Sequence, residues 1–260
     1  MISRRDFVIS SGMAGLALTG GFAGSNQLAA QTASPGGQMG TSTSGAASKG
    51  APFTLPELRF PFDALQPHVD AKTMEVHHDK HHLAYVEKLN AAIGKHPDLT
   101  QRVLPELLAN LDKVPEDVRQ DIRNNGGGHA NHMMFWTIMS PDGRREPKGG
   151  IAAAVNQGFS SLDEMKKAFN SAGQKHFGSG WVFVVVDPKS GSMEVVTRAN
   201  QDTPLMEGKR VLFGNDLWEH AYYLKYNNRR EEYLNAWWNV VDWNEIGRRY
   251  DAIRSGDAVI

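Results

Sequence analysis

One stretch of strand-forming residues interrupts a chain that is otherwise patterned for helices. Residues 181–186 read Trp-Val-Phe-Val-Val-Val, a β-branched and aromatic run typical of a buried strand. Turn residues at 187–191 lead to a second strand-like stretch at 193–198, and residues 210–213 are a candidate third strand. A hairpin alone is only marginally stable in water, so this sheet must pack on helices. The order predicts the α+β class: an N-terminal helical hairpin domain, then a mixed domain with a three-stranded antiparallel sheet and helices.

On both sides of the predicted sheet, the spacing of apolar residues is helical. The clearest helix is expected over residues 70–94, where large side chains recur every three or four positions. A capping box at 161–164 opens a helix that runs to about residue 176. Three consecutive glycines at 126–128 are expected to interrupt the helical pattern. Further helices are expected over residues 99–111, 115–125, 129–139, 217–227, 231–238 and 244–253.

The first 51 residues are not expected to belong to the fold. Arg4 and Arg5 precede an uncharged stretch, and residues 1–30 as a whole have the pattern of a cleaved export signal. The arginine pair resembles the twin-arginine signal of bacteria. Residues 31–51, rich in Gly, Ser, Thr and Ala, predict a flexible spacer.

These segments predict where the protein acts and how the rest of the chain divides. We expect an exported protein, periplasmic or extracellular, with no stable membrane insertion after processing. An uncleaved signal would instead leave the protein tethered to the membrane. We expect an α-helical metal-binding domain over residues 52–142 and an α+β metal-binding domain over residues 143–260.

Composition excludes several classes of function. The chain has 28 basic and 29 acidic residues, a net charge of −1, which argues against a general nucleic-acid binder because such proteins need a basic face. There is no cysteine, so disulfides, thiolate metal sites, iron–sulfur clusters and catalytic thiols are impossible. Any tightly bound metal ion must be held by His, carboxylate or Met.

Histidines supply the main chemical signal. Seven of the ten fall in three short windows, at 77–82, 129–132 and 216–220. Within each window, residues three or four apart would lie side by side on a helix, with Cβ atoms ~5–6 Å apart. This spacing favours His77 with His81 as a ligand pair, and Asp216 with His220 as another. Each pair alone is a weak signal, because such pairs also occur on polar helix faces that bind no metal. Three windows flanked by aromatic residues favour a metal site, and imidazole with carboxylate suits iron, manganese or zinc.

Other catalytic motifs are missing from the sequence. It has no His-Glu-x-x-His, no Gly-rich phosphate loop and no Gly-x-Ser-x-Gly. Glu-x-x-His occurs once, at Glu75 and His78, whereas a di-iron carboxylate bundle needs it twice.

Five ordered motifs carry a family resemblance. They are His-His-x-Lys-His-His-x-Ala-Tyr-Val from His77, Gly-Gly-His-x-Asn-His-x-x-Phe-Trp from Gly127, Gly-Ser-Gly-Trp from Gly178, Asn-Gln-Asp from Asn200, and Asp-x-Trp-Glu-His-Ala-Tyr-Tyr-Leu from Asp216. With them, the chain resembles the iron/manganese superoxide dismutases from Pro56 to about Tyr250.

The resemblance implies a specific set of site residues. The four protein ligands of one manganese or iron ion per subunit would be His77, His132, Asp216 and His220. Four further residues would have catalytic roles: His81 and Tyr85 at the mouth of the substrate funnel, Gln201 beside the metal-bound solvent, and Arg230 drawing the anionic substrate in. His81 is thus moved out of the ligand set that spacing alone suggested.

The resemblance also implies an activity, a preferred metal and an assembly. The protein would be an oxidoreductase that converts superoxide into oxygen and hydrogen peroxide by alternately reducing and oxidising its metal. Gln201 together with Gly128 is the manganese-type pattern, so manganese is preferred over iron. The subunits would form a homodimer or tetramer through Glu219, His220, His81 and Tyr223.

Departures from the family pattern at Phe183, at Glu231 and at Met133 with Met134, and two competing functions, accompany this interpretation. Phe183 stands where a second Trp is usual in the family, although it replaces no predicted ligand. The leading alternative is an exported, non-catalytic metal-binding protein of the same fold, against which Gln201, Tyr85 and His81 argue because storage needs no proton relay. A zinc hydrolase lacks an evident general base beside an open zinc position.

Overall fold

The computed structural model describes residues 52–143 and 146–257. Its longest helical run begins after Asp70. The Asp70 carboxylate caps the first turn by accepting a hydrogen bond from the backbone N–H of Thr73 (2.8 Å). The run consists of α1 (Ala71–Val76), a π-helical segment η1 (His77–His82) and α2 (Leu83–Ile93). The helix expected over residues 70–94 is therefore confirmed, with an unexpected wide turn in its middle.

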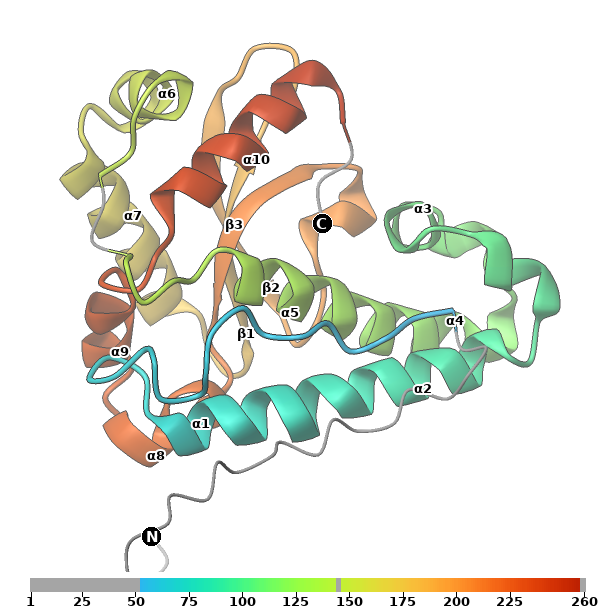
Figure 1. Cartoon of the computed structure of the whole chain (residues 1–260). Coiled ribbons are helices and arrows are strands. Elements are labelled where there is room, and N and C mark those ends of the chain that lie inside the picture. The colour runs from blue at the N-terminus through green and yellow to red at the C-terminus, as the bar shows by residue number, and fades with distance from the viewer. Residues whose placement is uncertain (1–51, 144–145, 258–260) are drawn as a thin grey trace, which may run out of the picture. The chain divides into compact units, whose positions relative to one another are not determined.

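A second long helical run lies beside the first, and the two form the predicted helical hairpin (Figure 1). It consists of α4 (Glu116–Asp121), a second π-helical segment η4 (Ile122–Gly126) and α5 (Gly127–Thr137). The prediction that three glycines interrupt this helix is wrong. The glycines serve close packing: a Cβ on Gly128 would lie 2.7 Å from the ring of Tyr85, and one on Gly127 would lie 2.2 Å from the carbonyl oxygen of Gln201.

The connection between the two helical runs is made of short pieces. The single helix expected over residues 99–111 is instead divided into η2 (Pro97–Gln101), α3 (Leu104–Ala109) and η3 (Leu111–Lys113). Pro105 sits in the first turn of α3, where its missing N–H costs nothing.

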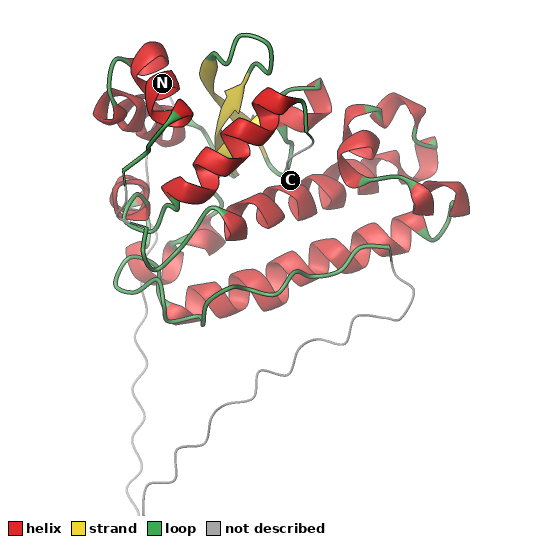
Figure 2. Ribbon diagram, turned by 45° about the horizontal axis from the view of Figure 1, so that its top comes forward, coloured by secondary structure: helices red, strands yellow, loops and turns green. Residues whose placement is uncertain are grey.

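The predicted sheet is confirmed, with three strands among the described residues. They are β1 (Gly180–Val186), β2 (Met193–Ala199) and β3 (Arg210–Asp216), in the order β2-β1-β3 and antiparallel throughout. Every residue of β1 is buried, because both neighbouring strands and the helices around the sheet cover it (Figure 2). The β1–β3 register shifts between Val184 and Val185, which leaves Leu212 of β3 outside the ladder.

Helices on the C-terminal side complete the α+β fold. They are α6 (Gly150–Phe159), α7 (Leu162–Lys175), α8 (Tyr223–Tyr226), α9 (Arg230–Trp237) and α10 (Trp243–Ser255), with 3₁₀ turns η5 (Pro204–Glu207) and η6 (Glu219–Ala221). Helix α7 packs on β1 and β2, and α10 packs on β3. Ser161 caps α7 as predicted, by accepting from the backbone N–H of Glu164 (3.1 Å). In the described part of the chain, no helix is both long and apolar enough to cross a membrane.

The structure differs from the sequence prediction in two places. Helix α6 lies where no helix is expected, and the helix expected over residues 217–227 is replaced by η6 and the four-residue α8. The predicted export signal and spacer lie outside the described residues.

Candidate metal centre

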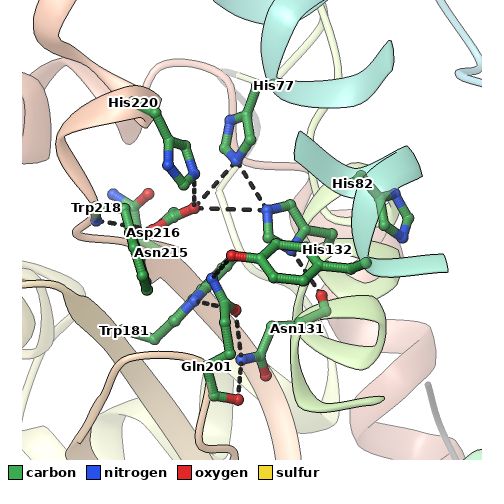
Figure 3. Close-up of polar contacts among 12 residues, drawn as sticks. His77, His82, Asn131, His132, Trp181, Gln201, Asn215, Asp216, Trp218 and His220 are labelled. Atoms are coloured by element: carbon green, nitrogen blue, oxygen red, sulfur yellow. Dashed lines mark hydrogen bonds and ion pairs between the residues drawn. The ribbon is translucent and has the colours of Figure 1, made fainter. Parts of the chain in front are cut away.

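Four side chains from four different elements converge in the interior (Figure 3). His77 begins η1, His132 lies on α5, Asp216 ends β3 and His220 lies in η6. Each offers one ligand atom, and these four atoms all lie within 4.8 Å of one another. The His77 Nε2 atom is 3.0 Å from both the His132 Nε2 and the Asp216 Oδ2. The His220 Nε2 is 3.3 Å from the same carboxylate oxygen.

Backbone contacts aim two of these groups at the centre. Nδ1 of His132 donates a hydrogen bond to the carbonyl oxygen of Gly128 (2.6 Å). Because a carbonyl can only accept, Nδ1 carries the hydrogen and the neutral ring keeps its lone pair on Nε2. Oδ1 of Asp216 accepts from the backbone N–H of Trp218 (2.8 Å), which leaves Oδ2 facing the histidines.

Burial sets the charge state of the cluster. His77 and His132 are 1% and 0% exposed, and burial lowers the pKa of His77 to about 4 and that of His132 well below its usual range. Burial alone would raise the pKa of Asp216, but its interactions with His220 and His77 outweigh that effect and lower it. At neutral pH the centre therefore holds the neutral imidazoles of His77 and His132 beside an ionised carboxylate.

This donor set fits a cation. The described residues give the buried Nε2 of His220 no hydrogen-bond partner of acceptable geometry, although Asp216 is near. A metal ion would satisfy this nitrogen, the facing Nε2 atoms and the buried carboxylate together. Three imidazoles and one carboxylate, with no thiolate, suit manganese, iron or zinc.

A hydrogen-bonded layer surrounds the four ligands. The Gln201 amide donates through Nε2 to the Tyr85 hydroxyl (3.0 Å) and accepts through Oε1 from the Trp181 indole (3.0 Å). The Asn131 amide donates to the Gln201 backbone carbonyl (3.2 Å). Burial raises the pKa of Tyr85 to about 12, so its hydroxyl stays protonated at neutral pH. Sequence reasoning assigned no role to Asn131, although its place one residue before His132 was a signal.

Two family models match the chain, and each covers two of the four residues at this centre. One, described as the α-hairpin domain of iron/manganese superoxide dismutases, covers residues 52–140, and the other, the C-terminal domain of the same family, covers residues 147–249. The chain belongs to the iron/manganese superoxide dismutases.

Curated superoxide dismutases support the assignment over the same part of the chain. A protein of Listeria innocua serovar 6a named "Superoxide dismutase [Mn]" is 50% identical over 202 residues, which are 78% of this chain and 99% of the relative. "Superoxide dismutase [Mn] 3" of Leptolyngbya boryana is 52% identical over 202 residues, 78% of this chain and 84% of the relative. "Superoxide dismutase [Mn] 1" of the same organism is 49% identical, over 77% of this chain and 81% of the relative.

In this superoxide dismutase, the structure brings together the four residues predicted as ligands, and His81, which spacing paired with His77, is not among them. The His81 ring contacts that of His77 edge-on and stacks on His220, with centroids 4.1 Å apart and planes 14° apart. Asp216 and His220 do meet, but as the end of a strand and a residue of a 3₁₀ turn. The expectation that a helix places them side by side is wrong, because β3 continues three residues beyond the predicted 210–213.

Arg230, predicted to draw the anion in, is itself extensively hydrogen-bonded. Its guanidinium donates to the backbone carbonyls of His176 (2.7 Å), Gly178 (2.9 Å) and Leu217 (3.1 Å). Its Nε donates to the Tyr222 hydroxyl (3.1 Å). The side chain thus fastens the loop after α7 to the segment that follows Asp216.

A second pair of histidines, His82 and His129, is hydrogen-bonded beside His132. The Trp136 indole donates to Nδ1 of His82 (2.9 Å), and Nε2 of His82 lies 2.8 Å from Nδ1 of His129. Because an indole N–H can only donate, Nδ1 of His82 accepts, so its Nε2 carries the hydrogen and donates to His129. The His82 ring stacks on that of His132, with centroids 5.2 Å apart.

Proposed function

We propose that this superoxide dismutase works through one ion held by His77, His132, Asp216 and His220. When bound, a manganese or iron ion supplies a redox couple that takes one electron from a first superoxide, released as oxygen, and gives it to a second, which takes up two protons and leaves as hydrogen peroxide. The observation that carries the proposal is the convergence of four ligand atoms within 4.8 Å, three of them on imidazoles and one on a carboxylate.

Tyr85 and Gln201 hold a proton donor beside the centre. The Tyr85 oxygen accepts from the Gln201 amide, which leaves the phenolic hydrogen free to point elsewhere. The raised pKa of Tyr85, about 12, keeps that hydrogen in place at neutral pH. The two residues therefore serve proton delivery to the developing peroxide, a role that a metal-storage protein would not need.

His81 and Arg230 serve the approach of substrate. His81 stacks on His220, the ligand with the most exposed side chain of the four, at 15%. The cationic Arg230 is fixed near the Asp216–Trp218 segment by its carbonyl contacts. A fixed positive charge at the entrance raises the local concentration of an anion such as superoxide.

The decisive experiment pairs metal content with activity in one preparation. Superoxide removal should rise in proportion to bound manganese or iron, and His132→Ala should lose both. The matched control is His96→Ala, because the His96 ring is hydrogen-bonded to the surface residue Asp117 and is not part of the candidate centre. A fully metal-loaded protein without activity would favour the non-catalytic metal-binding alternative.

Manganese is the preferred ion in this proposal. Gln201 occupies one of the two positions that the family uses for this glutamine, and Gly128 occupies the other. A side chain at 128 would collide with Tyr85, since even a Cβ would lie 2.7 Å from its ring, so the glutamine fits only at 201. The test reconstitutes the metal-free chain with each ion separately: manganese should restore the greater activity per ion, and equal or greater activity with iron would contradict the preference.

We also propose a homodimer or tetramer built on the face around Glu219, His220, His81 and Tyr223. Phe177 is 99% exposed, and Tyr223 and Leu224 are 47% and 61% exposed. The hydrogen bonds of Arg230 join the loop carrying Phe177 to Tyr222, the neighbour of Tyr223. The Glu219 carboxylate would pair with His220 of the partner subunit. Light scattering of Phe177→Ser and Glu219→Ala should show loss of the assembly, whereas a monomeric parent chain would exclude it.

The N-terminal segment supports a proposal of export. Arg4 and Arg5 precede an uncharged stretch, as in signals read by the twin-arginine pathway. The protein would then act in the periplasm or outside the cell, tethered to the membrane only if the signal is retained. Fractionation of a bacterium that expresses the chain, with R4K/R5K as the comparison, tests this: wild type should leave the cytoplasm and the variant should remain there.

A further inference from the structure

The loop that carries Gln201 is fastened to the helical run that carries His132 at a point outside the metal centre. Arg123 of η4 donates through Nε to Oδ1 of Asp202 (2.8 Å) and through Nη2 to Oδ2 (2.6 Å). Asp202 directly follows Gln201. The two residues are 79 positions apart in sequence, so this two-bond fork joins segments that only the fold brings together.

Two other residues of the same helical run hold the same loop. Gly127 lets the loop approach so closely that a Cβ there would lie 2.2 Å from the Gln201 carbonyl oxygen. Asn131 donates to that oxygen from its side chain (3.2 Å). Arg123, Gly127 and Asn131 recur at a spacing of four, so one stripe of the run contacts the loop at successive points. The next residue, His132, is a ligand.

The fork is better suited to positioning than to stabilising the fold. The side chains of Arg123 and Asp202 are 48% and 28% exposed, and exposed ion pairs contribute little to stability. A two-bond arginine–carboxylate pair does, however, fix both distance and orientation. The side-chain amide of Gln201 must be placed accurately, because it hydrogen-bonds the Tyr85 hydroxyl and the Trp181 indole at the same time.

We propose that Arg123 and Asp202 are a positioning pair that sets the Gln201 amide relative to Tyr85 and the metal centre. This inference rests on the role proposed above for Gln201. Neither member of the pair contacts a ligand residue by any hydrogen bond or ion pair among the described residues, so the pair acts through the loop. Weakening the pair should leave metal binding intact but change the superoxide-removing activity and the visible spectrum, which depend on the position of the Gln201 amide.

The test compares R123Q, D202N and the double variant in the metal-loaded full chain. The control is R248Q, because Arg248 forms a similar fork with Glu245 (2.9 and 2.7 Å) within α10. At equal metal content, each single variant should lose about threefold to thirtyfold in superoxide removal, as expected for outer partners of a metal site. The double variant should lose no more than a single one, because the pair acts as a unit.

Two further measurements separate positioning from general damage. The visible spectrum of the oxidised metal and its pH dependence should change in R123Q and D202N but not in R248Q. Hydrogen exchange of the backbone over residues 199–203 should quicken in the same two variants, while β1 and α10 keep their protection. Unchanged activity, spectrum and exchange in both single variants, or losses that multiply in the double variant, would overturn the inference.

A Gln201→Asn variant distinguishes two cases: the positioning inference is wrong, or the role proposed for Gln201 is wrong. If Q201N lowers activity and R123Q does not, only the positioning pair is wrong. If Q201N retains full activity and an unchanged spectrum, the role of Gln201 is wrong and the positioning inference is overturned with it.

Discussion

The Nε2 atoms of His77 and His132 face each other at 3.0 Å in the interior of the protein. The Gly128 carbonyl fixes the hydrogen of His132 on its other nitrogen, so one lone pair points directly at the neighbouring ring. Asp216 lies 3.0 Å from the same His77 nitrogen. One hydrogen on the His77 nitrogen could satisfy only one of these neighbours, whereas a cation would satisfy the three groups together.

Removing the metal should therefore lower thermal stability. A ligand that binds only the folded state at 100 times its Kd stabilises it by about 2.7 kcal/mol. We expect chelation to lower the Tm and added Mn²⁺ to restore it in a concentration-dependent way. A His132→Ala variant, lacking one ligand, should respond much less. Identical melting curves with and without metal would show that the cluster does not bind the ion.

Gly128→Ala should damage catalysis without emptying the site. The new methyl group would lie 2.7 Å from the Tyr85 ring, so Tyr85 must move and its 3.0 Å bond to Gln201 is lost. We expect activity to fall about 10- to 100-fold at unchanged metal content. Gly158→Ala is the control, because nothing lies within 4 Å of its Cβ; it should keep full activity and gain about 0.5–1 kcal/mol of stability.

Stability should depend on pH through the buried His129. Burial lowers its pKa from 6.5 to about 4, so between these values the unfolded chain binds more protons than the folded one. Its contribution is thus complete above pH 6.5 and is lost as the pH falls to about 4. At about 1.4 kcal/mol per pKa unit, the loss is about 3 kcal/mol.

Chemical unfolding at several pH values, in wild type and His129→Gln, measures this contribution. Metal ligands also titrate in acid, but they do so in both proteins, so the difference between the two reports His129 together with its hydrogen-bonded partner His82. The variant should lose less stability than wild type over this pH window. Parallel pH dependence in the two proteins would contradict the assignment.

Arg249→Met should destabilise the fold. The shifted register of β3 leaves Leu212 outside the ladder, and the Arg249 guanidinium donates to the carbonyls of Leu212 (2.8 Å) and Val211 (3.1 Å). Burial lowers the pKa of Arg249 to about 10, so its charge is costly, but the carbonyls would be left unpaired without it. We expect a loss of about 1–3 kcal/mol in denaturant unfolding. The exposed neighbour offers the control Arg248→Met, which should lose less than about 1 kcal/mol; equal losses would refute the role of the bulge.

Sequence reasoning found the fold class because its signals are local. The hairpin follows from the β-branched run at Trp181–Val186 (within β1) and the turn after it. The ligand set came from a family resemblance, since periodicity alone pairs His77 with His81. What periodicity cannot show is the π-helical segment that begins at His77, because one wide turn changes which residues share a face.

The missed features depend on partners distant in sequence. Gly127 and Gly128 look like a helix break, yet they are helical because Gln201 and Tyr85 leave no room for a Cβ. The two hydrogen bonds of Arg123 likewise cannot be predicted from local sequence, because its partner Asp202 is 79 residues away. Helix α6 lacks a local start signal, since its N-cap is Gly149 and no side chain caps it, and it packs against α7 and α10.

The positions of the four proposed ligands in the chain also determine when a metal could be acquired. His77 and Asp216 are 139 residues apart, and their side chains meet only after the helical hairpin has docked on the end of β3. An unfolded chain has no such site, so a cation cannot guide the early steps of folding as it does in a zinc finger. We therefore expect the metal content of the purified protein to depend on which ion is available where folding finishes.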